Sequence, residues 1–378
     1  MIIPFNKPHL TGLEEYYLKK AINNKHFSGK GQFTDKCNLL LKKELKVLET
    51  LLVPSGTAAL EMAAILLDLK KGDEVILPSF TFPSTANAFC LRGARPVFLD
   101  INEDDLNMDI TGLENAISKK TKAIFNVNYG GVSSNLGGLL EIATNQNLFL
   151  VEDAAHGLGS FYKNKPIGSI GHLSAFSFHD TKNIICGEGG ALVINHSKFI
   201  ERAKFIQEMG TDKTLMREGK KKKYCWVDIG SSYLLSDLLA AFLYPQLLNI
   251  KKITTKREKV YLRYKEMLDP FVQKGLIKIQ KIPNFCQTNF HTFYILLRNQ
   301  KSKNIFMTEM KRRGITTSGH FFPLHGSKMG KFFGYQMKDL PMSFSVYKRI
   351  VRLPVWPDMT DNQIQYVCDQ ANNILKFF

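Results

Sequence analysis

The sequence has no long uninterrupted hydrophobic run. None of its segments approaches the ~18 consecutive apolar residues that a membrane-spanning helix requires. Its first residues, MIIPFNKPHLTG, also lack the basic stretch followed by an apolar stretch that marks a secretory signal. We therefore expect a cytoplasmic protein with no membrane partner.

Cysteine is scarce and scattered. The six cysteines of the 378-residue chain include no CxxC pair. In a chain of this length, such isolated thiols are typical of a reduced core rather than of a disulfide framework or a zinc site. We expect no metal site.

Acidic residues are outnumbered. The chain has 34 aspartates and glutamates against 51 lysines and arginines, a formal net charge of +17. Such an excess can attract nucleic acid, and it can equally attract a phosphate or diphosphate ligand. The lysines are spread along the chain, no helix-turn-helix pattern is present, and the run Lys220 to Lys223 is typical of a solvated face. We expect no nucleic-acid partner, although a cofactor-binding regulator of DNA stays open as a remote alternative.

Predicted strands alternate with predicted helices through the first two thirds of the chain. Short apolar strands are predicted at residues 73–78, 95–99, 122–128, 148–151, 174–178 and 190–195. The alternation predicts an α/β domain over residues 1–250, with a mainly parallel sheet between layers of helices. The pattern over residues 251–378 predicts a smaller α+β domain.

Two segments of the larger domain predict local departures from regular structure. Residues 211–228 are polar and lysine-rich, which predicts a mobile loop. The apolar helix that follows contains Pro245, which should kink or end it, because proline lacks the N–H that a helix interior needs.

The stretch from Phe149 to Gly190 gathers polar residues at the ends of two predicted strands. Asp153 and His156 follow the first strand. Ser177 lies near the end of the second strand, and Lys182 follows it on a loop. Ligands of open α/β sheets bind outside the carboxyl ends of the strands. A pyridoxal phosphate enzyme needs there a lysine that forms a Schiff base and an aspartate that keeps the pyridine nitrogen protonated. Asp153 and Lys182 therefore indicate this chemistry.

Two further segments suit the same ligand. Ser55, Gly56 and Thr57 open a helix rich in alanine and leucine, where free N–H groups favour a phosphate, although an ordinary helix cap would look alike. The pattern GxxxxGK[ST] is absent, which argues against a P-loop. Phe82 follows the strand at 73–78 and could lie against a flat ring or simply belong to the core.

The order of these segments and their amino-acid sequences resemble those of a known protein family. The segments PSGTAALEMA, GDEVILPSFTFPSTANA, FLVEDAAHGLGS, FSFHDTKN and GEGGALV are similar to those of the DegT/StrS sugar-nucleotide aminotransferases. The resemblance covers essentially the whole chain, from the opening IPFNKP to the PLH near the end. It implies a fold-type I pyridoxal phosphate transferase with a smaller C-terminal domain.

The resemblance also implies residue roles. Lys182 would hold the cofactor and move the proton, and Asp153 would pair with the pyridinium nitrogen. His156 would lie near the ring hydroxyl, where the family often has glutamine, although His156 and His179 could equally be ordinary hydrogen-bonded histidines. The phosphate would be held by Ser55, Gly56, Thr57 and Ser177, and the ring would stack on Phe82.

One motif departs from the family pattern. Many members carry asparagine and arginine before the long helix, where the neighbouring subunit of a homodimer reaches into the site. This chain has Ser232 and Leu234 in GSSYLLSD, so one hydroxyl replaces an amide and a cation is missing. The variant resembles the branch of the family that makes dTDP-4-amino-4,6-dideoxygalactose for surface polysaccharides such as enterobacterial common antigen, lipopolysaccharide and O-antigen.

The implied reaction moves the amino group of L-glutamate to the 4-keto carbon of dTDP-4-keto-6-deoxyglucose, with pyridoxamine phosphate between the two halves. Relatives that have histidine in place of the lysine dehydrate sugars instead, so Lys182 favours transamination. Amination at C-3, another nucleotide or another stereochemistry stays open within the family. A pyridoxal phosphate lyase or dehydratase is a more distant alternative.

Overall fold

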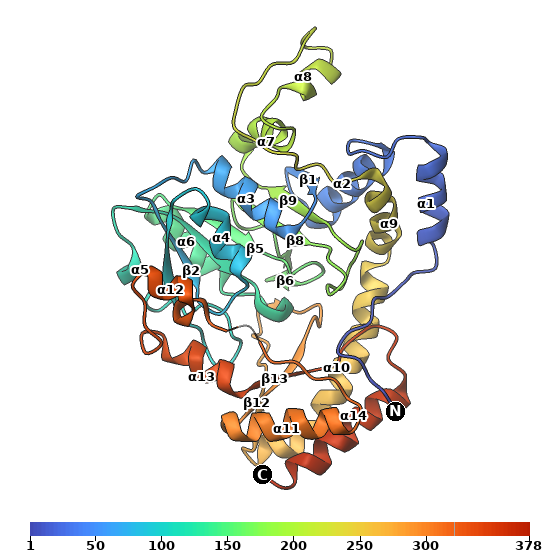
Figure 1. Ribbon diagram of the computed structural model, residues 1–378, viewed down its shortest axis with the longest axis vertical. Helices are drawn as coiled ribbons and strands as arrows, with labels where there is room; N and C mark the ends of the chain where they lie inside the picture. The colour runs from blue at the N-terminus through green and yellow to red at the C-terminus, as the bar shows by residue number, and fades with distance from the viewer. Residues whose placement is uncertain (321) are drawn as a thin grey trace.

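A seven-stranded sheet forms the centre of the computed structural model, which describes residues 1–320 and 322–378 (Figure 1). Its strand order is β1-β9-β8-β5-β4-β2-β3. The strands are β1 (Glu49–Val53), β2 (Glu74–Pro78), β3 (Arg95–Leu99), β4 (Thr121–Val127), β5 (Phe149–Asp153), β8 (Leu173–Ser177) and β9 (Gly190–Ile194). Only β9 runs antiparallel to its neighbours. The predicted mainly parallel sheet is confirmed.

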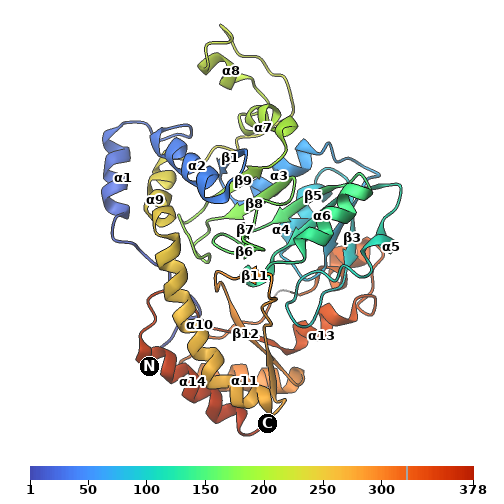
Figure 2. The ribbon, with the colours of Figure 1, turned by 180° about the vertical axis from the view of Figure 1, so that it is seen from behind.

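Helices cover both faces of this sheet, as the front and back views show (Figures 1 and 2). On one face, apolar side chains pack from α3 (Gly56–Leu66), α4 (Pro83–Cys90) and α7 (Ile200–Gln207). On the other face they come from α2 (Gln32–Leu45), α6 (Leu136–Asn145) and α9 (Asp237–Leu248). The interior strands are buried on both faces, as expected for a parallel sheet.

The edge strand β1 was not predicted from the sequence. It is only five residues long, and its partner β9 lies far along the chain. Side chains satisfy backbone groups of this strand that have no strand partner: Asn38 Oδ1 accepts from the Leu52 N–H at 2.9 Å, and Gln207 Nε2 donates to the Leu52 carbonyl at 2.7 Å. A covered edge of this kind cannot pair with a foreign strand.

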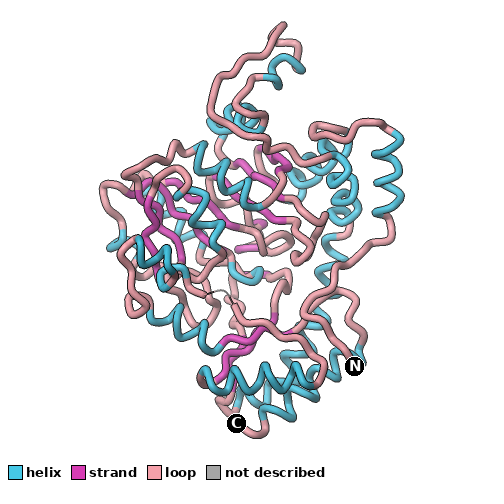
Figure 3. The backbone as a smooth tube through the Cα atoms, viewed as in Figure 1, coloured by secondary structure: helices cyan, strands magenta, loops and turns pink. Residues whose placement is uncertain are grey.

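The C-terminal part has its own antiparallel sheet, in the order β10-β12-β13, which lies apart from the central strands in Figure 3. These strands are β10 (Ile277–Ile279), β12 (Phe293–Leu297) and β13 (Ile350–Leu353). They form a separate hydrophobic cluster with α10 (Ile250–Gln273), α11 (Gln300–Arg312) and α14 (Asp361–Leu375). A division between residues 250 and 251 stays a proposal, which the start of α10 at Ile250 supports.

Short elements complete the fold. The remaining helices are α1 (Glu14–Asn23), α5 (Leu113–Ala116), α8 (Lys213–Arg217), α12 (Lys328–Phe332) and α13 (Pro341–Arg349). A small third sheet contains β6 (Phe161–Tyr162), β7 (Lys165–Pro166) and β11 (Cys286–Gln287), and so joins the two parts of the chain. No helix of the described residues has the length and apolar character to cross a membrane.

Two local expectations need correction. The segment 211–228 is not entirely a loop, because it contains the helix α8. Pro245 does not end α9, because the helix continues as far as Leu248, while the alternative of a kink at Pro245 stays a prediction.

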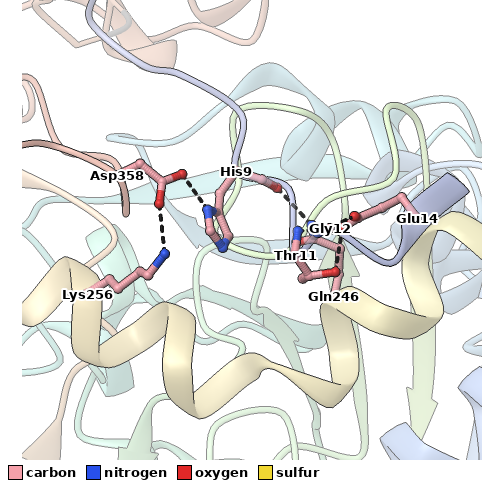
Figure 4. A network of polar contacts seen from close by, with 7 residues as sticks. All are labelled: His9, Thr11, Gly12, Glu14, Gln246, Lys256 and Asp358. Carbon is pink, nitrogen blue, oxygen red and sulfur yellow. Dashed lines mark hydrogen bonds and ion pairs between the residues drawn. The ribbon is translucent and has the colours of Figure 1, made fainter.

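The N-terminal arm, residues 1–12, crosses to the C-terminal part of the chain. The Ile3 N–H donates to the Gly314 carbonyl at 2.8 Å, and the buried Ile3 side chain joins the C-terminal cluster. Figure 4 shows further contacts of the arm. Asp358 contacts His9 Nδ1 at 2.5 Å and Lys256 Nζ at 2.8 Å, while Gln246 Nε2 donates to the His9 carbonyl at 2.8 Å.

Candidate active site

A cavity of about 500 Å³ lies at the carboxyl ends of β5 and β8. Side chains from the central sheet and from the C-terminal part both line it. It contains every predicted site residue except Ser232, namely Ser55, Gly56, Thr57, Phe82, Asp153, His156, Ser177 and Lys182. The two strands that carry Asp153 and Ser177 are direct neighbours, as the sequence predicted.

Asp153 ends β5 and is buried. Thr85 Oγ1 donates to its Oδ2 at 2.7 Å, and the Ala155 N–H donates to its Oδ1 at 3.2 Å. Burial raises the pKa of the carboxyl group, while these two donors and the Lys182 amine act in the opposite direction. The carboxylate is thus held in one orientation and is suited to a cationic partner in the cavity.

Lys182 lies on the loop between β8 and β9. Its backbone N–H donates to the His179 carbonyl at 2.9 Å, which closes a turn beneath the side chain. The pKa of the amine is lowered to about 8, because removal from water and the charge of Arg352 together outweigh the opposing effect of Asp153. A lysine amine with such a pKa is partly neutral near pH 7 and can act as a nucleophile or a base.

The start of α3 forms the anion-binding part of the cavity. Ser55 caps the helix by accepting from the Ala58 N–H at 3.0 Å, and the first N–H groups of a helix have no intrahelical acceptor. A Cβ on Gly56 would approach Ser177 Cβ to 3.0 Å, so the helix start packs tightly on the end of β8. Beside it, the hydroxyls of Thr57 and Ser84 lie 2.7 Å apart. Backbone donors and hydroxyls therefore meet where a phosphate could bind.

Flat side chains also line the cavity. Phe82, at the start of α4, is 51% exposed and lines the cavity. His156 stacks on His291 with ring centroids 4.2 Å apart. Burial lowers the pKa of His156 well below its ordinary value, so the ring is neutral. Its Nδ1 lies 3.3 Å from the Gly130 nitrogen and accepts from that N–H, which places the His156 proton on Nε2.

Other histidines in or near the cavity have different surroundings from those of His156. His179 is partly exposed at the cavity wall, and its Nδ1 lies 2.9 Å from Thr181 Oγ1. Of two further histidines in the C-terminal part, His320 lines the cavity, while His325 is buried against Ser79 and Met337 outside it. Only part of that pair therefore belongs to the site.

Sequence reasoning missed several lining or supporting residues. Thr85, which supports Asp153, lies in a quoted family segment but was given no role. Arg257 on α10, His291 before β12 and Arg352 on β13 line the cavity from the C-terminal part. No local pattern marks these three residues, because only the tertiary fold brings them to the central sheet.

Ser232 is the exception among the predicted residues. It is exposed, pairs by backbone with Glu208, and does not line the cavity of its own chain. It ends the α8 segment, residues 208–232, which projects away from the body in Figure 1. Its predicted role therefore requires a second copy of the chain.

The sequence profile of the DegT/DnrJ/EryC1/StrS aminotransferases matches residues 9–372. The chain belongs to this family.

Named relatives agree with this membership. The spore coat polysaccharide biosynthesis protein SpsC of Bacillus subtilis is 34% identical over 86% of this chain and 85% of its own length. The GDP-perosamine synthase of Escherichia coli O157:H7 is 29% identical over 98% of both chains. The PLP form of Streptococcus pneumoniae Spr1654 has the same fold, with a TM-score of 0.92, 23% identity and coverage of 100% and 99% of the two chains.

Membership of this aminotransferase family identifies the protein as an enzyme and confirms the predicted enzyme class. The predicted fold class, an α/β fold with helices on both faces of a mainly parallel sheet, is also confirmed. These similarities do not establish the predicted product, dTDP-4-amino-4,6-dideoxygalactose, because one relative is a synthase of a different sugar, GDP-perosamine.

Proposed function

We propose that this protein is a pyridoxal phosphate-dependent aminotransferase that moves the amino group of L-glutamate to the keto carbon of a nucleotide sugar. The observation that carries the proposal is the shared cavity of Lys182, Asp153 and the start of α3. Spr1654, which has the same fold, is known in a PLP form. Family membership and the relatives' names support a sugar as the acceptor.

The residues of the cavity fit pyridoxal phosphate. The tight approach of Gly56 to Ser177 brings the backbone of the helix start to the cavity wall, which suits a phosphate group. The buried Asp153 carboxylate suits a protonated pyridine nitrogen, and the partly neutral Lys182 amine suits an aldehyde. When bound, the cofactor would supply that aldehyde and a ring that accepts electrons from the bond being broken.

Lys182 would perform the proton transfers. Its Nζ would hold the cofactor in the resting enzyme, and once released it would take the proton from the donor's α-carbon and return it at the cofactor carbon. In the second half-reaction the same amine would move the proton in the reverse direction. A pKa of about 8 allows the amine to do both near neutral pH.

The other residues would orient the cofactor. Asp153, aligned by Thr85, would keep the pyridine nitrogen protonated. His156 would donate its Nε2 proton to the ring hydroxyl, and Phe82 would stack on the ring. The phosphate would be held by Ser55, Gly56, Thr57 and Ser177.

For the acceptor we favour dTDP-4-keto-6-deoxyglucose, aminated at C-4 to give dTDP-4-amino-4,6-dideoxygalactose. The GSSYLLSD motif supports this choice, and the name of SpsC supports a role in surface polysaccharide synthesis. A GDP-linked keto-sugar is the second candidate, because one relative is a GDP-perosamine synthase. The cytoplasmic location stays a prediction of the sequence.

A homodimer would complete the site. The projecting α8 segment carries exposed apolar side chains, among them Trp226 at 78% exposure. Packed against a second subunit, this segment would bring Ser232 to the partner's phosphate site, where its hydroxyl could donate one hydrogen bond.

Absorbance spectroscopy tests the proposed reaction. With pyridoxal phosphate, the wild type and the exposed-lysine control Lys119→Ala should show a band near ~420 nm that Lys182→Ala lacks. Adding L-glutamate should bleach the band, and adding dTDP-4-keto-6-deoxyglucose should restore it. Absence of a Lys182-dependent band would contradict the proposal, while a band unaffected by glutamate would contradict transamination.

Product analysis tests the acceptor. Mass spectrometry and NMR after parallel reactions with dTDP-linked and GDP-linked keto-sugars would identify the nucleotide and the aminated carbon. A C-3 amine, or turnover of the GDP sugar alone, would overturn the specific assignment while leaving the aminotransferase intact.

A further inference from the structure

Arg352 brings a guanidinium group into the cavity from β13, on the C-terminal side. Its Nε donates to the Gly319 carbonyl at 2.9 Å, and its Nη2 donates to Ser318 Oγ at 3.0 Å. The ring of Phe5 lies 5.1 Å from the guanidinium carbon and packs against its flat face. The group is therefore fixed in orientation by neutral partners.

The described residues leave part of this guanidinium without a partner. A guanidinium has five N–H donors, and the two hydrogen bonds of Arg352 use only Nε and Nη2. No carboxylate of the described residues forms an ion pair with it. Nη1 thus remains available in a group whose geometry matches a carboxylate.

Arg257, the other arginine of the cavity, differs in its surroundings. It is only 3% exposed, and its Nε and Nη2 donate to the carbonyls of Phe290 and His291 at 3.0 and 2.6 Å. Burial lowers its pKa to about 9. Arg257 thus orders the backbone beside His291 and adds positive charge to the wall. Its Nη1 is also unused by the described residues, but of the two arginines it is Arg352 whose charge acts on the Lys182 amine.

We propose that Arg352 binds the α-carboxylate of the amino donor and so positions the donor's nitrogen and α-hydrogen beside Lys182. The inference rests on the proposed function and adds to it the residue that recognises the donor. Two carboxylates line the cavity, but Asp153 is bonded to Thr85 and Glu188 lies 3.7 Å from His179. Neither of them neutralises Arg352.

The position of the charge favours a carboxylate over a sugar diphosphate. Arg352 lines the cavity together with Lys182 and Tyr129, and its charge acts on both: it adds to the lowering of the Lys182 pKa and opposes the rise that burial causes in the pKa of Tyr129. In an amino acid the α-carboxylate is attached to the carbon that carries the reacting nitrogen. In a nucleotide sugar the diphosphate is separated from the keto carbon by the sugar ring. A cation near the reacting amine therefore suits the amino acid.

The N-terminal arm is part of this donor site. Backbone hydrogen bonds from Ile3 to Gly314 and from Thr316 to Ile3 fix the arm just before Phe5. Phe5 then covers the guanidinium face. Phe5 would act as a positioning residue, because it restricts Arg352 without contacting the donor's carboxylate.

Separate half-reactions test the role of Arg352. For Arg352→Gln, the glutamate concentration that gives half-maximal bleaching should rise about 10- to 100-fold, the loss expected for a charge-assisted hydrogen bond. Arg352→Lys should recover part of this loss, and Phe5→Leu should show a smaller rise in the same parameter. The exposed Arg312→Gln serves as a matched control and should behave as wild type.

The second half-reaction separates donor from acceptor binding. Each variant is first prepared in its pyridoxamine phosphate form. The keto-sugar concentration that gives the half-maximal rate should then stay within about twofold of wild type, because the substitutions do not change the contacts that bind the keto-sugar. Calorimetric titration with glutarate, a dicarboxylate that cannot react, should show weaker binding to Arg352→Gln and to Phe5→Leu than to wild type.

The outcomes are distinct. Equal glutamate dependence in wild type and Arg352→Gln would overturn the inference and leave the proposed function standing. A change confined to the keto-sugar step would assign Arg352 to the nucleotide sugar and would also overturn it. Failure of wild type itself to react with glutamate would contradict the proposed function. If Arg352→Gln does not fold, the Phe5→Leu titrations decide.

Discussion

At the scale of single residues, the lowered pKa of Lys182 has a direct consequence for cofactor capture. Only the neutral amine attacks an aldehyde, and with a pKa of about 8 roughly a tenth of it is neutral at pH 7. The rate at which the cofactor-free protein captures pyridoxal phosphate should therefore rise about tenfold per pH unit below pH 8 and level off above it. Stopped-flow absorbance from pH 6 to pH 10 measures this rate.

An ordinary lysine supplies the contrasting outcome. Its capture rate would keep rising toward pH 10.5, its usual pKa. A rate that still rises about tenfold per pH unit between pH 8 and pH 10 would show that the Lys182 amine is solvated and that burial does not lower its pKa. The matched variant Asp153→Asn removes the negative charge that opposes the shift, so its plateau should begin at a lower pH than that of wild type.

The site residues at the ends of the central strands could be predicted from the sequence. The site residues that the fold brings to the cavity from the C-terminal part could not. Asp153 and Lys182 could be found because parallel strands deliver their following residues to one edge. Arg352 could not be found in this way, because its strand, β13, belongs to a different sheet and no sequence motif near it predicts a position in the cavity. The same holds for His291, which reaches His156 only through the tertiary fold.

At the scale of elements, the start of α3 depends on the absence of a side chain in β9. A Cβ on Gly190 would lie 2.4 Å from the Ser55 carbonyl carbon, which is backbone and cannot move aside cheaply. Gly190→Ala should therefore shift the helix start and lower the free energy of unfolding by about 1–3 kcal/mol. Affinity for pyridoxal phosphate, measured by fluorescence titration, should fall with it.

Gly112 provides the control for this substitution. A Cβ there would meet nothing within 4 Å, and its φ of −95° is open to any residue. Gly112→Ala should leave both stability and cofactor affinity close to wild type. Wild-type affinity in Gly190→Ala would show that the contact between β9 and α3 does not set the phosphate site.

Element boundaries show why prediction from sequence was incomplete at this scale. The strongly apolar interior strands were predicted within a few residues of their observed bounds. The edge strand β1 was missed because part of its pairing comes from the side chains of Asn38 and Gln207 rather than from strand partners. The short helix α8 was read as loop, because its residues include no apolar stripe that is buried.

At the scale of the whole molecule, the projecting α8 segment makes the proposed dimer testable. Trp226→Asp places a charge where an apolar contact is proposed, so the dimer dissociation constant should rise about 10- to 100-fold. Sedimentation over a concentration series measures this change, and activity at low protein concentration should fall in parallel. Phe332→Asp, equally exposed at 76% but on α12, should remain dimeric. A wild type that sediments as a monomer would contradict the dimer.

The course of the N-terminal arm also determines when the cavity can be finished during synthesis. The arm is synthesised long before its partners Gly314, Arg352 and Asp358. The central sheet can fold as soon as its own strands are available. The wall that Phe5 and Arg352 form together can close only after Arg352 has emerged from the ribosome, so a growing chain can contain the central sheet before it can recognise an amino donor.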